Sequence, residues 1–102
     1  MKLDCIATLI FRKETGKDDN GNPVFEVSDK EVFGVLSSIG QREFYRARQQ
    51  GLKPEVRLTV YADEGEGAEF MRVDRVLYKV LRSYRPSPDK LELIGERCFS
   101  NV

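Results

Sequence analysis

Residues 55–62, Glu-Val-Arg-Leu-Thr-Val-Tyr-Ala, contain the most regular pattern in the chain. Apolar side chains occupy every second position from Val56 to Ala62, and the positions between them are mostly polar. A period of two places alternate side chains on opposite faces of a β-strand, whereas a helix needs a period of about 3.6. The stretch therefore predicts a strand with one buried face, and with it a mainly β fold.

A similar alternation begins near the N-terminus. In residues 3–11 every odd position is apolar, which predicts a second strand with one buried face. Ile6 and Ile10 add apolar groups to the opposite face. We therefore expect that this opposite face is either covered by another part of the protein or forms a contact surface.

The chain then turns and returns. Residues 13–23 are rich in Gly, Asn and Asp and predict a long exposed tip. Residues 24–39 predict the returning strand, with a bend or bulge near residues 28–30 where acidic residues interrupt the apolar pattern. The side chains expected on the inward side of this strand are Phe25, Val27, Phe33, Val35 and Ile39.

Residues 41–50, Gln-Arg-Glu-Phe-Tyr-Arg-Ala-Arg-Gln-Gln, lack alternation and are rich in good helix formers. They predict a short helix of two to three turns. Gly51 is placed to end this helix, and Pro54 prevents its continuation. We expect Phe44 and Ala47 to face the core, with Tyr45 as a further candidate for the inward side.

The C-terminal part completes a β fold. Residues 63–67 predict an acidic turn and residues 68–71 a short strand. Residues 73–84 fit both a helical and a strand period, and we predict a strand because their valines and tyrosines favour it. Residues 91–98 would be its hairpin partner. The whole chain, residues 1–102, is therefore expected to be one domain: a small antiparallel β-barrel or sandwich of about six strands with one short α-helix.

Length and composition narrow the class of protein. A chain of 102 residues supports one modest core and not two. Its 17 basic and 17 acidic residues cancel, so no overall field draws it to nucleic acid or anionic lipid. No run approaches the ~18 apolar residues of a membrane span, and Asp4 interrupts the first apolar run. We therefore expect synthesis in the cytoplasm and no membrane partner.

The sequence offers little for catalysis. It contains no histidine, the commonest general base and zinc ligand. Cys5 and Cys98 are too few for a zinc site, and we expect small buried thiols there, with a single bridge between them as the alternative. Carboxylates gather only in predicted turns, where solvation explains them. We expect no enzyme activity, no metal and no cofactor.

Charge is nevertheless banded along the chain. Residues 13–31 and 58–70 are net acidic, and residues 41–57 and 71–90 are net basic. Such bands either face solvent or match complementary bands on neighbouring copies. The basic residues that could line a channel or a subunit interface are Arg42, Arg46, Arg48, Lys53, Arg82 and Arg85. The tip residues that could contact a partner are Lys17, Asp18, Asp19, Asn20 and Asn22.

Residues 42–55 read Arg-Glu-Phe-Tyr-Arg-Ala-Arg-Gln-Gln-Gly-Leu-Lys-Pro-Glu, a short predicted helix that runs into a Gly-Leu-Lys-Pro-Glu exit. Together with five other stretches it resembles the head-tail joining family of tailed bacteriophages, also called head closure or stopper proteins. One departure concerns residues 73–76, where the family often carries a glycine turn and this chain has Val-Asp-Arg-Val. The other stretches that carry the resemblance are residues 3–10, 18–23, 32–38, 80–84 and 91–93.

The resemblance implies a structural protein of the virion, assembled in the host cytoplasm. Its copies would form a dodecameric or hexameric ring beneath the portal and its adaptor ring, and the free protein could be a monomer. The ring would close the channel behind the packaged double-stranded DNA and offer an attachment surface to tail proteins.

A second interpretation follows from the residues themselves. Basic side chains interleaved with Tyr78 and Tyr84 are what a small β-barrel needs to bind single-stranded nucleic acid by phosphate contacts and base stacking. The alternative without nucleic-acid binding places the tyrosines in the core and the arginines at a subunit boundary. The basic set is Arg72, Arg75, Lys79, Arg82 and Arg85.

Overall fold

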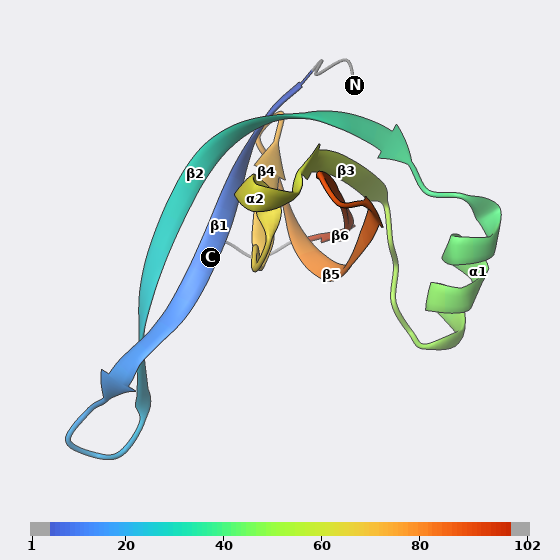
Figure 1. Cartoon of the computed structure of the whole chain (residues 1–102). Helices are drawn as coiled ribbons and strands as arrows, with labels where there is room; N and C mark the ends of the chain where they lie inside the picture. The colour runs from blue at the N-terminus through green and yellow to red at the C-terminus, as the bar shows by residue number, and fades with distance from the viewer. Residues whose placement is uncertain (1–4, 99–102) are drawn as a thin grey trace.

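The computed structural model describes residues 5–98, which form a closed β-barrel with two short helices (Figure 1). Around the barrel the strands follow the order β1-β2-β3-β6-β5-β4, and each neighbouring pair is antiparallel. The predicted mainly β fold of six strands is confirmed, as a barrel. Neither helix in the described range is long and apolar enough to cross a membrane. The elements are β1 (Cys5–Lys17), β2 (Pro23–Ser38), α1 (Gln41–Gln49), β3 (Val56–Tyr61), α2 (Ala62–Gly65), β4 (Phe70–Val73), β5 (Val76–Ser87) and β6 (Lys90–Arg97).

Inward side chains from all six strands fill the barrel. Leu58 and Val60 of β3 are fully buried, which confirms the inward face predicted for residues 55–62. They belong to one apolar cluster with Leu9 of β1, Met71 of β4 and Leu93 of β6. Because the sheet closes on itself, each barrel strand has a hydrogen-bonded neighbour on both sides, and the apolar inner face is removed from water.

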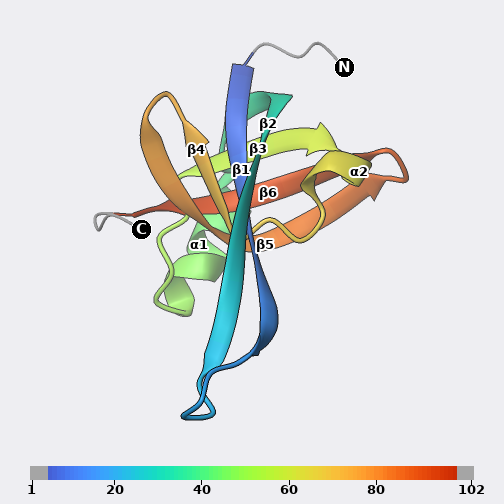
Figure 2. The ribbon, with the colours of Figure 1, turned by 90° about the vertical axis from the view of Figure 1, so that its left-hand side faces the viewer.

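The β1–β2 hairpin extends well beyond the barrel as a two-stranded ribbon (Figures 1 and 2). Residues 13–23 were expected to be a loop, but β1 continues to Lys17 and β2 begins at Pro23, so the tip is only residues 18–22. The side chain of Asp18 explains the tight tip, since its Oδ1 accepts hydrogen bonds from the backbone N–H groups of Asn20 and Asn22, each at 2.9 Å.

The inward face of β2 differs from the prediction. Cross-strand partners share a face of a sheet, and the pairing of Val32 with the buried Ala7 turns the even-numbered residues of β2 inward. Phe25, Val27 and Phe33 therefore point outward, and the prediction that they lie in the core is wrong. The bulge expected at residues 28–30 is also absent, because pairing there is regular. The register instead shifts between Glu14 and Gly16.

The turn between β4 and β5 forms without glycine. Asp74 and Arg75 both have positive φ angles, 51° and 68°. Two consecutive left-handed residues are typical of a type I′ turn, whose twist matches that of a hairpin. Val73 pairs with Val76 across this turn. The strand prediction for residues 73–84 is therefore confirmed from Val76 onward, whereas Val73 ends β4 and residues 74–75 form the turn.

The acidic turn expected at residues 63–67 begins as a one-turn helix instead. In α2, Ala62 and Gly65 are buried, and the helix lies against β3 and β6 (Figure 2). The N–H of Ala62 donates to the carbonyl of Asp89 in the β5–β6 turn at 2.9 Å. In that turn the Ser87 hydroxyl donates to the Asp89 carboxylate at 2.8 Å, and this hydrogen bond lowers the pKa of Asp89.

Candidate interaction surfaces

The outward side of β1 and β2 exposes large apolar side chains. Ile6 and Phe33 are cross-strand partners and are 52% and 54% exposed, and Val27, further along the ribbon, is 65% exposed. Large apolar side chains that are exposed on one side of a sheet point to an interaction surface. We call this surface the outer face. It comprises Ile6, Thr8, Ile10, Arg12, Glu14, Phe25, Val27, Asp29, Glu31, Phe33 and, from the adjoining β4, Arg72.

The register explains how the outer face is assembled from distant segments. Ile10 links the β2 and β4 parts of this face, because it pairs with Asp29 of β2 on one side and with Phe70 of β4 on the other. Side chains of directly paired residues lie on the same face. The outward row of β2 is acidic at Asp29 and Glu31, whereas β4 contributes the cation of Arg72.

A hollow of about 320 Å³ opens in the middle of the outer face. Its walls are the side chains of Ile10, Val27, Asp29 and Arg72. Two walls are apolar, and the other two carry opposite charges. Such a hollow can receive one apolar or aromatic side chain that ends in a polar group.

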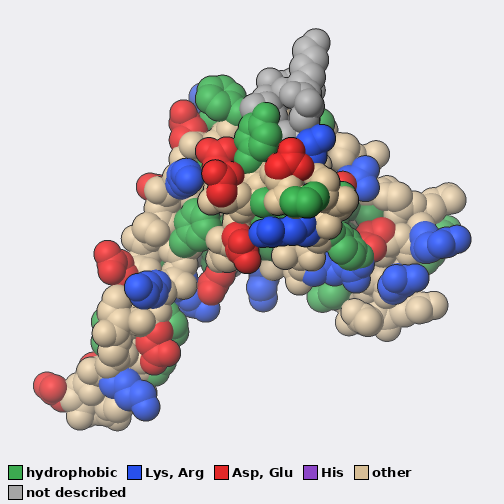
Figure 3. All heavy atoms as spheres, viewed as in Figure 1, with side chains coloured by type: hydrophobic (Ala, Val, Ile, Leu, Met, Phe, Trp, Pro, Cys, Tyr) green, Lys and Arg blue, Asp and Glu red, His purple; other side chains and the backbone are tan. Residues whose placement is uncertain are grey.

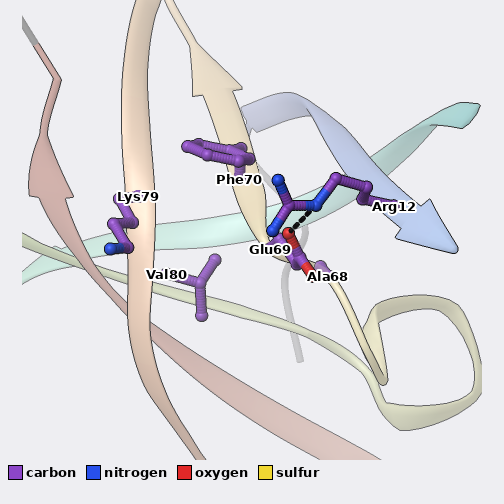
Figure 4. Close-up of a pocket in the computed structure, with 6 residues that line it drawn as sticks. All are labelled: Arg12, Ala68, Glu69, Phe70, Lys79 and Val80. Atoms are coloured by element: carbon purple, nitrogen blue, oxygen red, sulfur yellow. Dashed lines mark ion pairs between the residues drawn. The ribbon is translucent and has the colours of Figure 1, made fainter. Parts of the chain in front are cut away.

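A second hollow, of about 460 Å³, lies between the ribbon and β5 (Figure 4). Arg12 forms one wall, with its Nε 3.1 Å from the Glu69 carboxylate and its guanidinium 4.6 Å from the centre of the Phe25 ring. Arg12 thus ties the ribbon to the segment that leads into β4. The residues that line this hollow are Arg12, Ala68, Glu69, Phe70, Lys79 and Val80.

Within residues 5–98 no three Cys, Asp or Glu side chains are grouped as a metal ion would require. Cys5 and Cys98 are both half-buried, and no disulfide joins them.

On the opposite side of the barrel, α1 is attached by a polar clamp. Glu43 Oε2 accepts hydrogen bonds from the Arg82 guanidinium at 2.9 Å and from the Tyr84 hydroxyl at 3.0 Å. The Arg82 guanidinium also stacks 4.3 Å from the Tyr84 ring centre. Ala47, one turn after Glu43, is buried. Glu43 and Ala47 therefore define the side of α1 that faces the barrel.

This orientation contradicts the prediction for Phe44. Its side chain is 40% exposed and contacts the Tyr45 ring edge-on, with 6.0 Å between ring centres. Phe44 lies on the flank of a helix whose rotation is fixed by Glu43 and Ala47. The expectation that Phe44 belongs to the core is wrong, and Tyr45, the further inward candidate, is exposed as well. The expected burial of Ala47 is confirmed.

The structure divides the six predicted basic interface residues into two groups. Four are exposed on α1 and its exit, where Lys and Arg side chains stand out on the right-hand protrusion of Figure 3: Arg42, Arg46, Arg48 and Lys53. Arg82 is held by Glu43, and Arg85 pairs with Glu66 at 2.9 Å. Both β5 arginines are therefore engaged within their own chain, although a partner band on a neighbouring copy was the expectation.

The predicted partner loop lies at the far end of the ribbon. Lys17 closes β1, and the other members form the tip, where all five side chains are exposed. Figure 1 shows this tip and α1 projecting in different directions from the barrel. The tip and the basic helix therefore do not form one surface. The members of the loop are Lys17, Asp18, Asp19, Asn20 and Asn22.

The residues proposed for nucleic-acid binding do not form a single strip. Tyr78 is only 9% exposed and packs in the core, so it cannot stack on a base. Arg72 lies on the outer face, whereas Arg82 lies under α1 and covers the ring of Tyr84. Separated cations without a free aromatic ring among them lack the platform that single strands require.

Sequence reasoning found one half of the outer face and missed the other. Ile6 and Ile10 indicated apolar groups on the second face of β1, where the structure has Ile6 exposed and Ile10 half-buried. The β2 half was assigned to the core. Gly34 is the residue whose type could have revealed the orientation of β2. It lies in the inward row, where a Cβ atom would come within 2.7 Å of the Thr59 carbonyl oxygen.

No protein-family model and no curated protein sequence matches this chain. Its surfaces are therefore interpreted from their own chemistry.

Proposed function

We propose that this chain is a structural subunit of the head-tail connector of a tailed bacteriophage. Its copies form a ring that closes the portal channel after DNA packaging and offers the tail its attachment surface. The partners are other copies of the chain, the portal-adaptor ring, tail proteins and the double-stranded DNA in the channel. The sequence resemblance of residues 42–55 supports the identity of this assembly.

The observation that carries the proposal is the exposed outer face. Ile6, Val27 and Phe33 are all exposed on the same side of the β1–β2 sheet, and their burial against a partner would remove apolar area from water. The outer face and α1 lie on opposite sides of the barrel (Figure 2). Two different surfaces on opposite sides suit head-to-tail contacts, which form rings where the rotation from one copy to the next closes the circle.

The basic side chains of α1 suit the same role. Arg42, Arg46 and Arg48 have no ion pair within the described part of the chain, and all three are exposed. Lys53 extends this basic surface beyond the helix. In a ring around DNA these cations are available to phosphates or to an acidic surface of a neighbouring subunit.

Electron microscopy tests the proposal directly. Purified protein is mixed with portal–adaptor connectors or tailless capsids of the same virus. We expect an additional ring stacked on the connector, with no ring on capsids that lack the portal. Connectors that stay unchanged after mixing, at concentrations where the protein is folded, would overturn the proposal.

A further inference from the structure

The geometry points to the two surfaces that meet between copies: the solvent side of α1 on one copy docks on the outer face of the next, with Tyr45 in the hollow of Ile10, Val27, Asp29 and Arg72. This inference rests on the proposed function in one respect, namely that copies of the chain assemble with each other. It adds which residues form the contact and gives the contact a direction.

The solvent side of α1 has the composition of an interface anchor. Because Glu43 and Ala47 face the barrel, the helical period places Tyr45 and Arg48 on the opposite side. Tyr45 is 62% exposed, more than any other aromatic side chain in the described range. Tyr and Arg are enriched among the residues that dominate binding energy at protein interfaces. The Glu43 clamp holds them in a fixed orientation, which reduces the entropy lost on docking.

The hollow offers what a tyrosine side chain requires. Ile10 and Val27 form apolar walls for the ring. Asp29 can accept a hydrogen bond from the hydroxyl, and Arg72 can donate one to it, so a buried hydroxyl would not remain without a partner. No ion pair joins Asp29 to Arg72, and both groups remain available to an incoming side chain.

Charge complementarity selects α1 as the occupant. Asp29 and Glu31 form the acidic row on the β2 side of the hollow. On α1, Arg42 and Arg48 lie near Tyr45 and have no acidic partner among the described residues. Opposite charges around an apolar anchor set the register of a contact and exclude wrong partners.

The same charges argue against contact between two outer faces. A two-fold arrangement of that kind brings the surface of one copy against its own equivalent, and it is repulsive when the axis passes near the acidic row of Asp29 and Glu31. Docking of α1 on the outer face avoids this repulsion. Since α1 lies on the far side of the barrel from its own outer face, it cannot occupy that face within one molecule (Figures 1 and 2).

A complementation experiment tests the direction of the contact. One variant, Tyr45→Gln with Arg48→Glu, damages the helix side and keeps the outer face. The other, Val27→Lys with Asp29→Lys, damages the outer face and keeps α1. Each alone should sediment as a monomer, but the two mixed should form a heterodimer and no larger species, because only one intact pair of surfaces remains.

Nuclear magnetic resonance locates the contact. The ¹⁵N-labelled helix variant is titrated with the unlabelled face variant to about 1 mM, where even millimolar binding is visible. We expect saturable shifts of amide signals in residues 6–10 and 27–33. A titrant that carries all four substitutions should produce none. Glu26→Lys with Ser28→Lys, on the other side of the same ribbon, is the matched control and should leave wild-type association intact.

Three outcomes would overturn the inference: no shifts in the titration, shifts confined to other residues, or self-association of the helix variant as strong as that of the wild type. A folded state is checked first by signal dispersion, and Val27→Ser serves as a milder face variant. If the wild type joins connector rings while the two variants do not bind each other, this inference fails and the proposed function stands. If the variants pair while the wild type never joins a connector, the proposed function fails and the docking geometry stands.

Discussion

Glu43 of α1 and Arg82 of β5, which are 39 positions apart in the sequence, form a 2.9 Å ion pair that fixes the rotation of the helix on the barrel. Their side chains are 20% and 37% exposed, so water screens this pair only in part. The Tyr84 hydroxyl donates to the same carboxylate oxygen. This clamp determines which side chains of α1 face solvent, and it therefore sets the surface that the helix presents.

Replacement Glu43→Gln should loosen α1 without unfolding the barrel. The partly screened charge and its hydrogen bonds contribute about 1 kcal/mol to the free energy of unfolding. Chemical denaturation measures that loss, and hydrogen exchange should show faster exchange in residues 44–50. Glu66→Gln removes the more exposed pair with Arg85 and is the control, with an expected change below about 0.5 kcal/mol. Equal effects of the two substitutions would contradict the special role of Glu43.

Phe44→Ala should reduce stability only slightly. Because Phe44 is 40% exposed, its truncation leaves no sealed cavity, and we expect a loss below about 1 kcal/mol in chemical denaturation. Leu58→Ala is the matched core substitution. Leu58 is fully buried, so its loss should fall in the range of about 2 to 5 kcal/mol. A loss of several kcal/mol for Phe44→Ala would mean that α1 packs differently in solution.

The ribbon tip should depend on a single carboxylate. Asp18→Ala removes both hydrogen bonds from the N–H groups of Asn20 and Asn22, so backbone order parameters in residues 18–22 should fall below about 0.6. Asp19→Ala, at the neighbouring exposed position, should leave them unchanged. Order parameters that are already low throughout residues 13–23 in the wild type would contradict the paired ribbon.

The free chain should bind single-stranded DNA weakly. With a net charge of zero and Tyr78 in the core, we expect dissociation constants no tighter than about 10⁻⁴ M at physiological salt. Fluorescence anisotropy over a series of salt concentrations measures this. Micromolar binding that weakens steeply with salt and is lost in Arg72→Ala with Lys79→Ala would favour the nucleic-acid interpretation instead.

The sequence predicted strands well where apolar and polar residues alternate cleanly. It failed where either the odd-numbered or the even-numbered residues of a strand could face the core. Residues 55–62 alternate cleanly between apolar and polar side chains, and their inward face was predicted correctly. In β2 both the odd-numbered and the even-numbered positions carry apolar groups, so a period of two could not show which set faces inward. The pairing of Ala7 with Val32 decides it, and such pairing is a tertiary fact that no local pattern contains.

The candidate site was partly predictable for the same reason. The basic side chains of α1 follow from composition, but the rotation of the helix depends on Glu43 meeting a residue in β5. The length of the ribbon was underestimated because Thr15 and Gly16 are turn formers by composition, yet they lie in β1, with a register shift between Glu14 and Gly16. Long-range pairing overrode local propensity at each of these places.

One measurement tests the central claim most directly: the occupancy of the additional ring on portal–adaptor connectors with wild type, Val27→Asp and Ser28→Asp. Val27 belongs to the outer face, whereas Ser28 is an exposed neighbour that points to the other side of the ribbon. Arg82 is unsuitable for this test because its loss would also release α1. We predict rings with wild type and Ser28→Asp, and at least a tenfold loss of ring occupancy with Val27→Asp, the effect of about 1.4 kcal/mol at one contact. Equal occupancy for all three proteins, or no ring with the wild type, would contradict the account.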